Sequence, residues 1–374
     1  MPKPKLILFN NIMSPYTSRL WNNLSDIYEV LVVSCCDEEP NRQWSADFVN
    51  RFDHKLLPGF SIKLSPARFA HVNVGFRKVI KSFKPDLVIC NGFYPTMLGV
   101  ALACRMMGVP YIIQNDGWKE TMPVSAYHNL IRPFILKHCR GVIACSGKGG
   151  EYFSSQGVPR DMIFVSHLAP AWDEPEILPS YSERKYDLLW TAQVNKTIKN
   201  CLFFADIVAS LASRRPGLKV CVVGDGPDRA ELVERLSQTS AEVDYFPKVR
   251  WDKIHEIFLT SRLMLLPSLW EPWGLVCNEA MQSGTPCMVS RHVGAAGELV
   301  DNENGAIEDL VTESWVGTCE RLLEPSTWEA HSTNAVETAR RFGFKTYQAG
   351  YIEAFNTILA RLGVENVSVE PVLP

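Results

Sequence analysis

Two glutamates that flank the start of a short helix have residue types and a spacing suited to ligand binding. Glu271 lies in a loop that Pro272 and Gly274 keep out of regular structure, and Glu279, after a gap of seven residues, lies on the following helix. A helix N-terminus presents free N–H groups that suit a phosphate, and a carboxylate accepts hydrogen bonds from hydroxyls. The pattern predicts a site for a ligand with a phosphate and sugar hydroxyls. For an isolated pair of glutamates, two solvated surface charges would be the simpler interpretation.

The sequence around the two glutamates resembles the family 4 retaining glycosyltransferases. Trp273-Gly-Leu275 lies between the glutamates, Gly284-Thr-Pro286 follows them, and the glycine-rich segment from Arg291 to Glu298 ends in another glutamate. The resemblance implies a glycosyltransferase of the hexosyltransferase type. Such an enzyme moves a sugar from a nucleotide sugar to an acceptor hydroxyl and retains the anomeric configuration.

The resemblance also implies roles for these residues. Glu279 would bind the nucleotide ribose. Glu271, with the backbone of Trp273, Gly274 and Leu275, would orient the donor sugar and its diphosphate.

A second loop, from Thr191 to Asn200, corresponds to the segment in which relatives hold the diphosphate with an arginine and a lysine. Lys199 matches the lysine, whereas Gln193 stands in place of the arginine. A neutral hydrogen bond contributes about 0.5–1.5 kcal/mol and a charge-assisted one about 1.5–3 kcal/mol, so donor binding is expected to be weaker. We expect Lys196 or Lys199 to supply a compensating cation, although a solvated loop lysine is the alternative for Lys196. The turn that starts at Gly224 is expected to line the same donor site.

The N-terminal half contributes three further candidates. Ser14 and Pro15 follow the first predicted strand and resemble the first loop of a subset of the family. Asp116 follows a strand from Tyr111 to Gln114, where relatives place a histidine or an acidic residue beside the donor sugar. A simple Asp-Gly turn is the alternative for Asp116.

Two series of alternating strands and helices must position these residues, and such alternation predicts parallel sheets. The predicted domains are residues 1–170, on the acceptor side, and residues 186–344, which bind the nucleotide sugar. A Pro-, Glu- and Ser-rich linker (residues 171–185) joins them, and a C-terminal helix in residues 345–374 packs back on the first domain. This organisation resembles the α/β GT-B fold, in which two Rossmann-like domains face a cleft.

Two stretches of the N-terminal half are less regular in sequence. Residues 35–60 are predicted to be an irregular, charged and aromatic loop that could meet an acceptor. Residues 66–84 carry apolar residues three or four apart and are predicted to form one amphipathic helix.

Composition indicates a globular protein of about two domains, because the chain has 374 residues, 46% hydrophobic and 21% charged. No apolar run reaches the roughly 18 residues that span a bilayer, and the start reads as a strand and not a signal peptide. Eleven cysteines lack disulfide or zinc spacing, which favours a reducing cytoplasm. No Asp-x-Asp pair follows a strand, so we expect neither a metal nor another cofactor.

Charge is unevenly distributed along the chain. Residues 1–170 carry 19 basic and 12 acidic groups, and residues 171–374 carry 19 and 29. A positive half would attract an anionic lipid-linked acceptor or the inner face of a membrane, to which the protein would bind peripherally. Ordinary variation between domains remains an equal alternative. No nucleic-acid partner is expected.

Several functions remain open on this sequence. The expected activity uses a UDP- or GDP-sugar and a glycan or lipid-linked acceptor, in polysaccharide or glycoconjugate biosynthesis. A nucleotide-sugar hydrolase or epimerase on the same fold is one alternative. A catalytically silent partner that binds a glycan or another transferase is the second, and it is suggested by Gln193.

Overall fold

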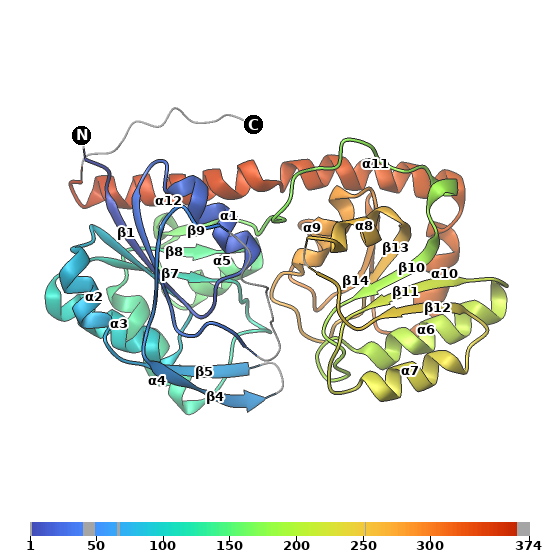
Figure 1. Cartoon of the computed structure of the whole chain (residues 1–374), viewed down its shortest axis with the longest axis horizontal. Helices are drawn as coiled ribbons and strands as arrows, with labels where there is room; N and C mark the ends of the chain where they lie inside the picture. The colour runs from blue at the N-terminus through green and yellow to red at the C-terminus, as the bar shows by residue number, and fades with distance from the viewer. Residues whose placement is uncertain (1, 40–48, 66–67, 251, 365–374) are drawn as a thin grey trace. The chain divides into compact units, whose positions relative to one another are not determined.

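The computed structural model describes residues 2–39, 49–65, 68–250 and 252–364. The chain divides into two compact units, which we call the N-terminal and C-terminal units (Figure 1). The N-terminal unit comprises Met1–Ala171 and Phe344–Pro374, and the C-terminal unit comprises Trp172–Gly343. Within the described residues, no helix combines the length and the apolar character needed to cross a membrane.

The N-terminal unit is built on a seven-stranded parallel sheet with the order β3-β2-β1-β6-β7-β8-β9. Apolar runs such as Leu6 to Phe9 form its central strands, which is typical of parallel strands covered on both faces, whereas the edge strand β3 is polar and exposed. The strands are β1 (Lys5–Asn10), β2 (Glu29–Ser34), β3 (Asp53–Leu56), β6 (Leu87–Asn91), β7 (Tyr111–Asn115), β8 (Val142–Ala144) and β9 (Ile163–Val165).

Helices cover both faces of this sheet (Figure 1). Ile7 and Phe9 pack into one buried cluster, and Leu6 and Leu8 into the other, because side chains alternate along a strand. The second cluster is completed by Phe355 from the far end of the chain. The helices are α1 (Pro15–Leu24), α2 (Phe76–Phe83), α3 (Pro95–Met107), α4 (Ala126–His138), α5 (Gly147–Ser155), η1 (Arg160–Met162) and α12 (Phe344–Arg361).

The prediction for residues 35–84 was wrong in two respects. The stretch predicted to be irregular contains β3 and the first two residues of β4 (Gly59–Ser65), although its residues 40–48 lie outside the described residues. The stretch predicted to be one helix contains β5 (Arg68–Asn73), paired antiparallel with β4, and only then α2. Phe69, His71 and Asn73 are buried at alternate positions, so a strand period explains residues that a helical stripe also fits.

The C-terminal unit contains a six-stranded parallel sheet with the order β12-β11-β10-β13-β14-β15. Its strands are β10 (Tyr186–Thr191), β11 (Lys219–Val223), β12 (Glu242–Phe246), β13 (Ser261–Leu266), β14 (Cys287–Ser290) and β15 (Gly305–Glu308). Its helices are η2 (Tyr181–Glu183), α6 (Cys201–Arg214), α7 (Arg229–Ser237), α8 (Ile254–Leu259), α9 (Leu275–Gln282), α10 (Thr312–Leu322) and α11 (Pro325–Arg341).

Hydrogen bonds from Arg184 attach the end of the predicted linker to the C-terminal unit. Its guanidinium is buried and donates hydrogen bonds to the carbonyl of Ser261 at 2.7 Å, the hydroxyl of Thr285 at 2.8 Å and the carbonyl of Ser283 at 2.8 Å. These acceptors border the beginning of β13 and the turn after α9. The end of the predicted linker therefore belongs to the C-terminal unit, which carries the predicted donor site.

Candidate functional site

Two loops that follow neighbouring strands bring Lys199 and Glu271 together. Strands β10 and β13 pair in parallel, so the loops after their carboxyl ends lie at the same edge of the sheet. The carbonyl of Ile198 accepts hydrogen bonds from the N–H groups of Leu269 at 2.8 Å and Trp270 at 3.3 Å, which ties one loop to the other. The Lys199 ammonium contacts the Glu271 carboxylate, with side-chain exposures of 19% and 12%.

The Lys199 loop is folded by its own side chains. Asn195 is buried, and its side-chain oxygen accepts hydrogen bonds from the N–H of Thr197 at 2.9 Å and its hydroxyl at 2.8 Å. The N–H of Lys199 donates to the carbonyl of Asn195 at 2.9 Å. This short turn directs Lys199 from a fixed backbone.

The Glu271 loop is held by the segment after β14. Glu271 donates its N–H to the carbonyl of His292 at 3.2 Å and accepts from the N–H of Gly294 at 3.0 Å. A Cβ at position 294 would lie 1.9 Å from the carbonyl oxygen of Pro272, so only glycine permits this approach. The glycine-rich segment from Arg291 to Glu298 therefore supports the Glu271 loop.

Helix α9 begins directly after this loop with an uncapped N-terminus. Gly274 adopts φ +99° as the N-cap residue, and no side chain caps the helix. Within the described part of the chain, the N–H groups of Gly274, Leu275 and Val276 donate no hydrogen bond. These groups and the helix dipole favour an anion at this position.

Trp273 holds the Glu271 loop in place through its side chain and through its backbone carbonyl. Its side chain is buried, its indole N–H donates to the side-chain oxygen of Asn278 at 2.8 Å, and its ring stacks on Phe342 with centroids 6.3 Å apart. Ala295 donates its N–H to the carbonyl of Trp273 at 2.8 Å. The indole thus anchors the loop to α9. Sequence reasoning missed the positioning role of Asn278, because nothing in its local sequence marks it.

Glu279 lies on α9 as a half-buried carboxylate. Among the described residues, no hydrogen-bond donor or cation contacts its side chain. Burial raises the pKa of Glu279 to about 8. A carboxyl group with such surroundings can accept hydrogen bonds from ligand hydroxyls and, when it is protonated, donate one to them.

The remaining donor-side candidates occupy three different environments. The Lys196 ammonium lies 2.9 Å from Glu231 and 3.2 Å from Asp228, so the structure does not bring it to Glu271. Gln193 is half-buried, and its amide has no partner within the described ranges. Gly224 has φ +136°, and a Cβ there would lie 1.9 Å from the carbonyl oxygen of Ala192, so this glycine lets the two loops meet.

The candidates Ser14, Pro15 and Asp116 belong to the N-terminal unit. The Ser14 hydroxyl caps α1 by accepting from the N–H of Thr17 at 3.2 Å, and Pro15 is the first residue of that helix. Asp116 is exposed directly after β7, where the Asn115 side chain accepts from the N–H of Gly117 at 2.8 Å. All three lie beyond the carboxyl ends of β1 and β7.

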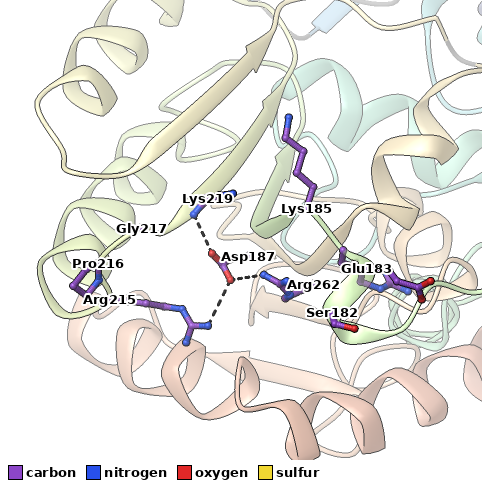
Figure 2. A pocket seen from close by; sticks show the side chains of 10 residues that line it. Ser182, Glu183, Lys185, Asp187, Arg215, Pro216, Gly217, Lys219 and Arg262 are labelled. Atoms are coloured by element: carbon purple, nitrogen blue, oxygen red, sulfur yellow. Dashed lines mark hydrogen bonds and ion pairs between the residues drawn. The ribbon is translucent and has the colours of Figure 1, made fainter.

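A polar pocket of about 460 Å³ lies at the opposite end of strands β10 and β11 (Figure 2). Asp187 at its centre lies 2.8 Å from Arg262 and 3.6 Å from Arg215, and it accepts from the N–H of Lys219 at 2.9 Å. The carboxylate pairs with two guanidinium groups and accepts a hydrogen bond from a strand amide. We interpret this cluster as structural, and sequence reasoning did not identify it.

Comparisons with known proteins place both halves of the chain in glycosyltransferase families. Residues 177–342 match the family described as glycosyl transferases group 1. Residues 13–169 match the family described as the glycosyl transferase 4-like domain. The two matches together cover every strand of the two sheets except β1 (Lys5–Asn10).

Individual relatives agree with these family matches. EpsF of Bacillus subtilis (strain 168), a presumed glycosyltransferase, is 28% identical over 295 residues, which is 72% of each chain. The D-inositol 3-phosphate glycosyltransferase of Rhodococcus erythropolis is 31% identical over 160 residues, which is 39% of this chain and 36% of the relative. The solved structure of HepE from Anabaena with UDP and glucose has a TM-score of 0.72 at 16% identity and covers 95% of this chain and 100% of HepE.

The sequence around Glu271 and Glu279 predicts a family 4 glycosyltransferase with the GT-B fold. The two parallel α/β units, the two family matches and the individual relatives agree with this prediction. The chain therefore belongs to the group 1 glycosyltransferases, family 4, with the GT-B fold.

Proposed function

We propose that the protein transfers a sugar from a nucleotide diphosphate sugar to a hydroxyl of a glycan or lipid-linked acceptor, with retention of the anomeric configuration. The observation that carries the proposal is the contact between Lys199 and Glu271 beside the free N–H groups of Gly274, Leu275 and Val276. HepE, which has a similar fold, has been solved with UDP and with UDP-glucose. A UDP-sugar is therefore the first donor to test, with a GDP-sugar as the second.

The donor diphosphate would bind between the helix start and the lysine. Its oxygens would accept hydrogen bonds from the uncapped N–H groups of α9, and Lys199 would lie beside the leaving phosphate. Fixed cations and amides stabilise the charge that develops as the nucleotide departs. We propose that this site needs no metal, because the lysine and the helix start supply that charge stabilisation.

Glu271 and Glu279 would bind the hydroxyl-bearing parts of the donor. In the unliganded protein Lys199 is paired with Glu271, and an arriving diphosphate competes for the same ammonium. Glu271 would then accept hydrogen bonds from the donor sugar. Glu279, which has no partner within the described residues, would accept hydrogen bonds from the ribose.

The charge of the N-terminal half indicates the kind of acceptor. Residues 1–170 carry 19 basic and 12 acidic groups, which favours an anionic acceptor such as a lipid-linked diphosphate. We propose a role in polysaccharide or glycoconjugate biosynthesis, in the cytoplasm or at the inner face of the membrane. Co-sedimentation with anionic and neutral vesicles at low and high salt tests this, and equal binding to both vesicle types would contradict it.

The donor half of the proposal is tested by ligand binding. The full chain is screened by thermal shift against UDP-, GDP- and ADP-sugars, since binding to the folded state raises the melting temperature. Affinity is then measured in Lys199→Ala and in the control Lys196→Ala, whose lysine is already paired with two carboxylates. A donor affinity that Lys199→Ala leaves unchanged would contradict the proposed site.

Product analysis separates the alternatives. With a glycan acceptor, the anomeric configuration of the product, read by NMR, must match that of the donor. Sugar release that no acceptor can divert would instead support a nucleotide-sugar hydrolase or epimerase. A protein that neither binds nor turns over a nucleotide sugar would support a catalytically silent partner.

A further inference from the structure

The N-terminal unit contains a cluster of three metal-ligating side chains that the proposed reaction does not use. Cys36 and Glu39 follow β2, and His71 lies on β5. The Cys36 sulfur, a Glu39 carboxylate oxygen and a ring nitrogen of His71 lie within 4.8 Å of one another. The three ligand types, thiolate, carboxylate and imidazole, are those that proteins use for zinc.

The cluster is buried and its histidine is oriented from both sides. His71 is 0% exposed and Glu39 is 5% exposed. The Nε2 atom of His71 lies 2.8 Å from Oε1 of Glu39, and the Nδ1 atom lies 2.8 Å from the hydroxyl of Ser61. A second partner on the other ring nitrogen is the usual way in which proteins fix a metal-binding histidine.

The backbone around the cluster is also fixed. His71 pairs with Ser61 across the β4–β5 hairpin, and its carbonyl accepts from the Thr96 hydroxyl at 2.8 Å. The amide of Asn73 donates to the carbonyl of Cys35 at 2.8 Å, which links β5 to the segment after β2. The cluster therefore joins two chain segments whose positions are set by other contacts.

The backbone of Asn11 contacts the Cys36 end of the cluster. Asn11 accepts at its carbonyl from the N–H of Cys36 at 3.1 Å and lies 3.6 Å from the Cys36 sulfur. The side-chain oxygen of Asn11 is buried and has no hydrogen-bond partner within the described residues. An unsatisfied buried acceptor is costly and calls for an explanation such as a water or an ion.

We propose that Cys36, Glu39 and His71 bind a divalent metal ion of the zinc class. A thiolate and a carboxylate balance the two charges of the ion, and three protein ligands leave one coordination position open. All three ligands belong to the N-terminal unit, whereas the donor residues Lys199 and Glu271 belong to the C-terminal unit. The site is therefore additional to the proposed metal-independent donor site and does not depend on the proposed function.

Without a metal, the same atoms form a hydrogen-bonded ion pair. Burial lowers the pKa of His71, but hydrogen bonds to Cys36 and Glu39 outweigh it and raise the pKa to about 9. A proton would then occupy the position between the imidazole and the carboxylate. A bound metal ion would protect the Cys36 thiol from alkylation, whereas a proton on His71 would not.

Cobalt substitution tests the site directly. Co²⁺ is titrated into the metal-free full chain, and we expect about one equivalent to bind with the thiolate-to-metal charge-transfer absorption of a tetrahedral thiolate site. Cys36→Ser should abolish that absorption, and the matched control Cys35→Ser should keep it, because the neighbouring thiol lies outside the cluster. Absorption that survives Cys36→Ser, or that never appears, would overturn the proposal.

Alkylation of the unmodified protein provides a test that does not rely on a variant. Cys36 is half-buried, whereas the other ten cysteines are buried, so it should react first with iodoacetamide. We expect Zn²⁺ to slow modification of Cys36 at least tenfold, as measured by mass spectrometry of the tryptic peptide, and EDTA to reverse the protection. A modification rate that is the same with Zn²⁺ and with EDTA would contradict metal binding.

Discussion

The ammonium of Lys199 contacts the carboxylate of Glu271 although 72 residues separate the two in the chain. Parallel pairing of β10 with β13 brings their following loops to one edge of the sheet, and the carbonyl of Ile198 links those loops. The pair stands beside the free start of α9.

Replacing Lys199 should affect turnover more than folding. In Lys199→Ala the leaving diphosphate loses its cation, and we expect kcat/KM to fall about 10²–10³-fold, as for the loss of one oxyanion-stabilising group. Steady-state kinetics with the best nucleotide sugar measures this effect. Lys196→Ala should change kcat/KM less than about threefold, because the Lys196 ammonium is paired with Asp228 and Glu231 at the start of α7. Equal losses in the two variants would be inconsistent with the assigned role.

Restoring an arginine at position 193 should strengthen donor binding. Gln193 is half-buried without a side-chain partner in the described structure, so the site accepts a polar side chain there. Exchanging a neutral bond for a charge-assisted one adds about 1 kcal/mol, which is about a fivefold lower Kd. Isothermal titration with the nucleotide diphosphate gives the value. A weaker affinity in Gln193→Arg would show that residue 193 does not reach the diphosphate.

Glu279 should make stability depend on pH between about pH 4.3 and pH 8. Its pKa is about 8 in the folded protein and about 4.3 in the unfolded chain. Between these values the folded state holds a proton that the unfolded state has lost, so the contribution is full below about pH 4.3 and disappears as pH rises through 8. Glu279→Gln cannot ionise, and between pH 5 and 9 it should gain about 2–5 °C in Tm relative to the unsubstituted protein.

Differential scanning fluorimetry across this pH range, without ligand, measures the gain. The exposed Glu337 on α11 supplies the control, because Glu337→Gln should follow the unsubstituted protein at every pH. A Tm difference for Glu279→Gln that stays constant from pH 5 to 9 would contradict the raised pKa.

Adding a methyl group at Gly294 should displace the Glu271 loop. The new Cβ would lie 1.9 Å from the carbonyl oxygen of Pro272, so either the loop or the segment after β14 must move. We expect Gly294→Ala to lower kcat/KM at least about 10²-fold, as misplacement of a site by about 1 Å can do. Gly317→Ala on α10 is the matched control, because nothing lies within 4 Å of the position that its new methyl group would take, and alanine favours the helix. Full activity in Gly294→Ala would show that the loop tolerates the shift.

Asp187 should be more important for stability than for catalysis. Removing its charge leaves Arg262 and Arg215 without their carboxylate, and breaking a buried pair costs about 3–5 kcal/mol. Urea denaturation of Asp187→Asn measures the change in the free energy of unfolding. Asp206→Asn, which breaks an exposed pair with Arg235, should cost less than about 1 kcal/mol. A similar small cost in both variants would instead favour a ligand-binding role for the pocket in Figure 2.

The sequence predicted the parts of the protein in which local pattern and tertiary environment agree. Strand β13, the loop around Glu271 and helix α9 all follow from an apolar run, a proline–glycine interruption and a Gly-Thr-Pro turn. The family and the fold were confirmed by the comparisons. The roles of Lys199, Glu271 and Glu279 stay predictions.

The sequence could not reveal features that depend on contacts between distant segments. Phe69 and Val72 fit a helical stripe, and only the pairing of β5 with β4 and the burial of His71 make them part of a strand. The Cys36, Glu39 and His71 cluster has no local metal-binding spacing, because its ligands meet through the hairpin. Asp187 reads as an ordinary strand residue until the two arginines beside it are known.

The path of the chain sets the order in which the units can fold during synthesis. Residues 172–343 are complete before α12 leaves the ribosome, whereas the N-terminal unit lacks Tyr351, Phe355 and Leu359 until α12 has been made. Until then one apolar face of its sheet is only partly covered, by α1, while the C-terminal unit is already able to form its core. A nascent chain of this protein would depend on chaperones chiefly through the half that is made first.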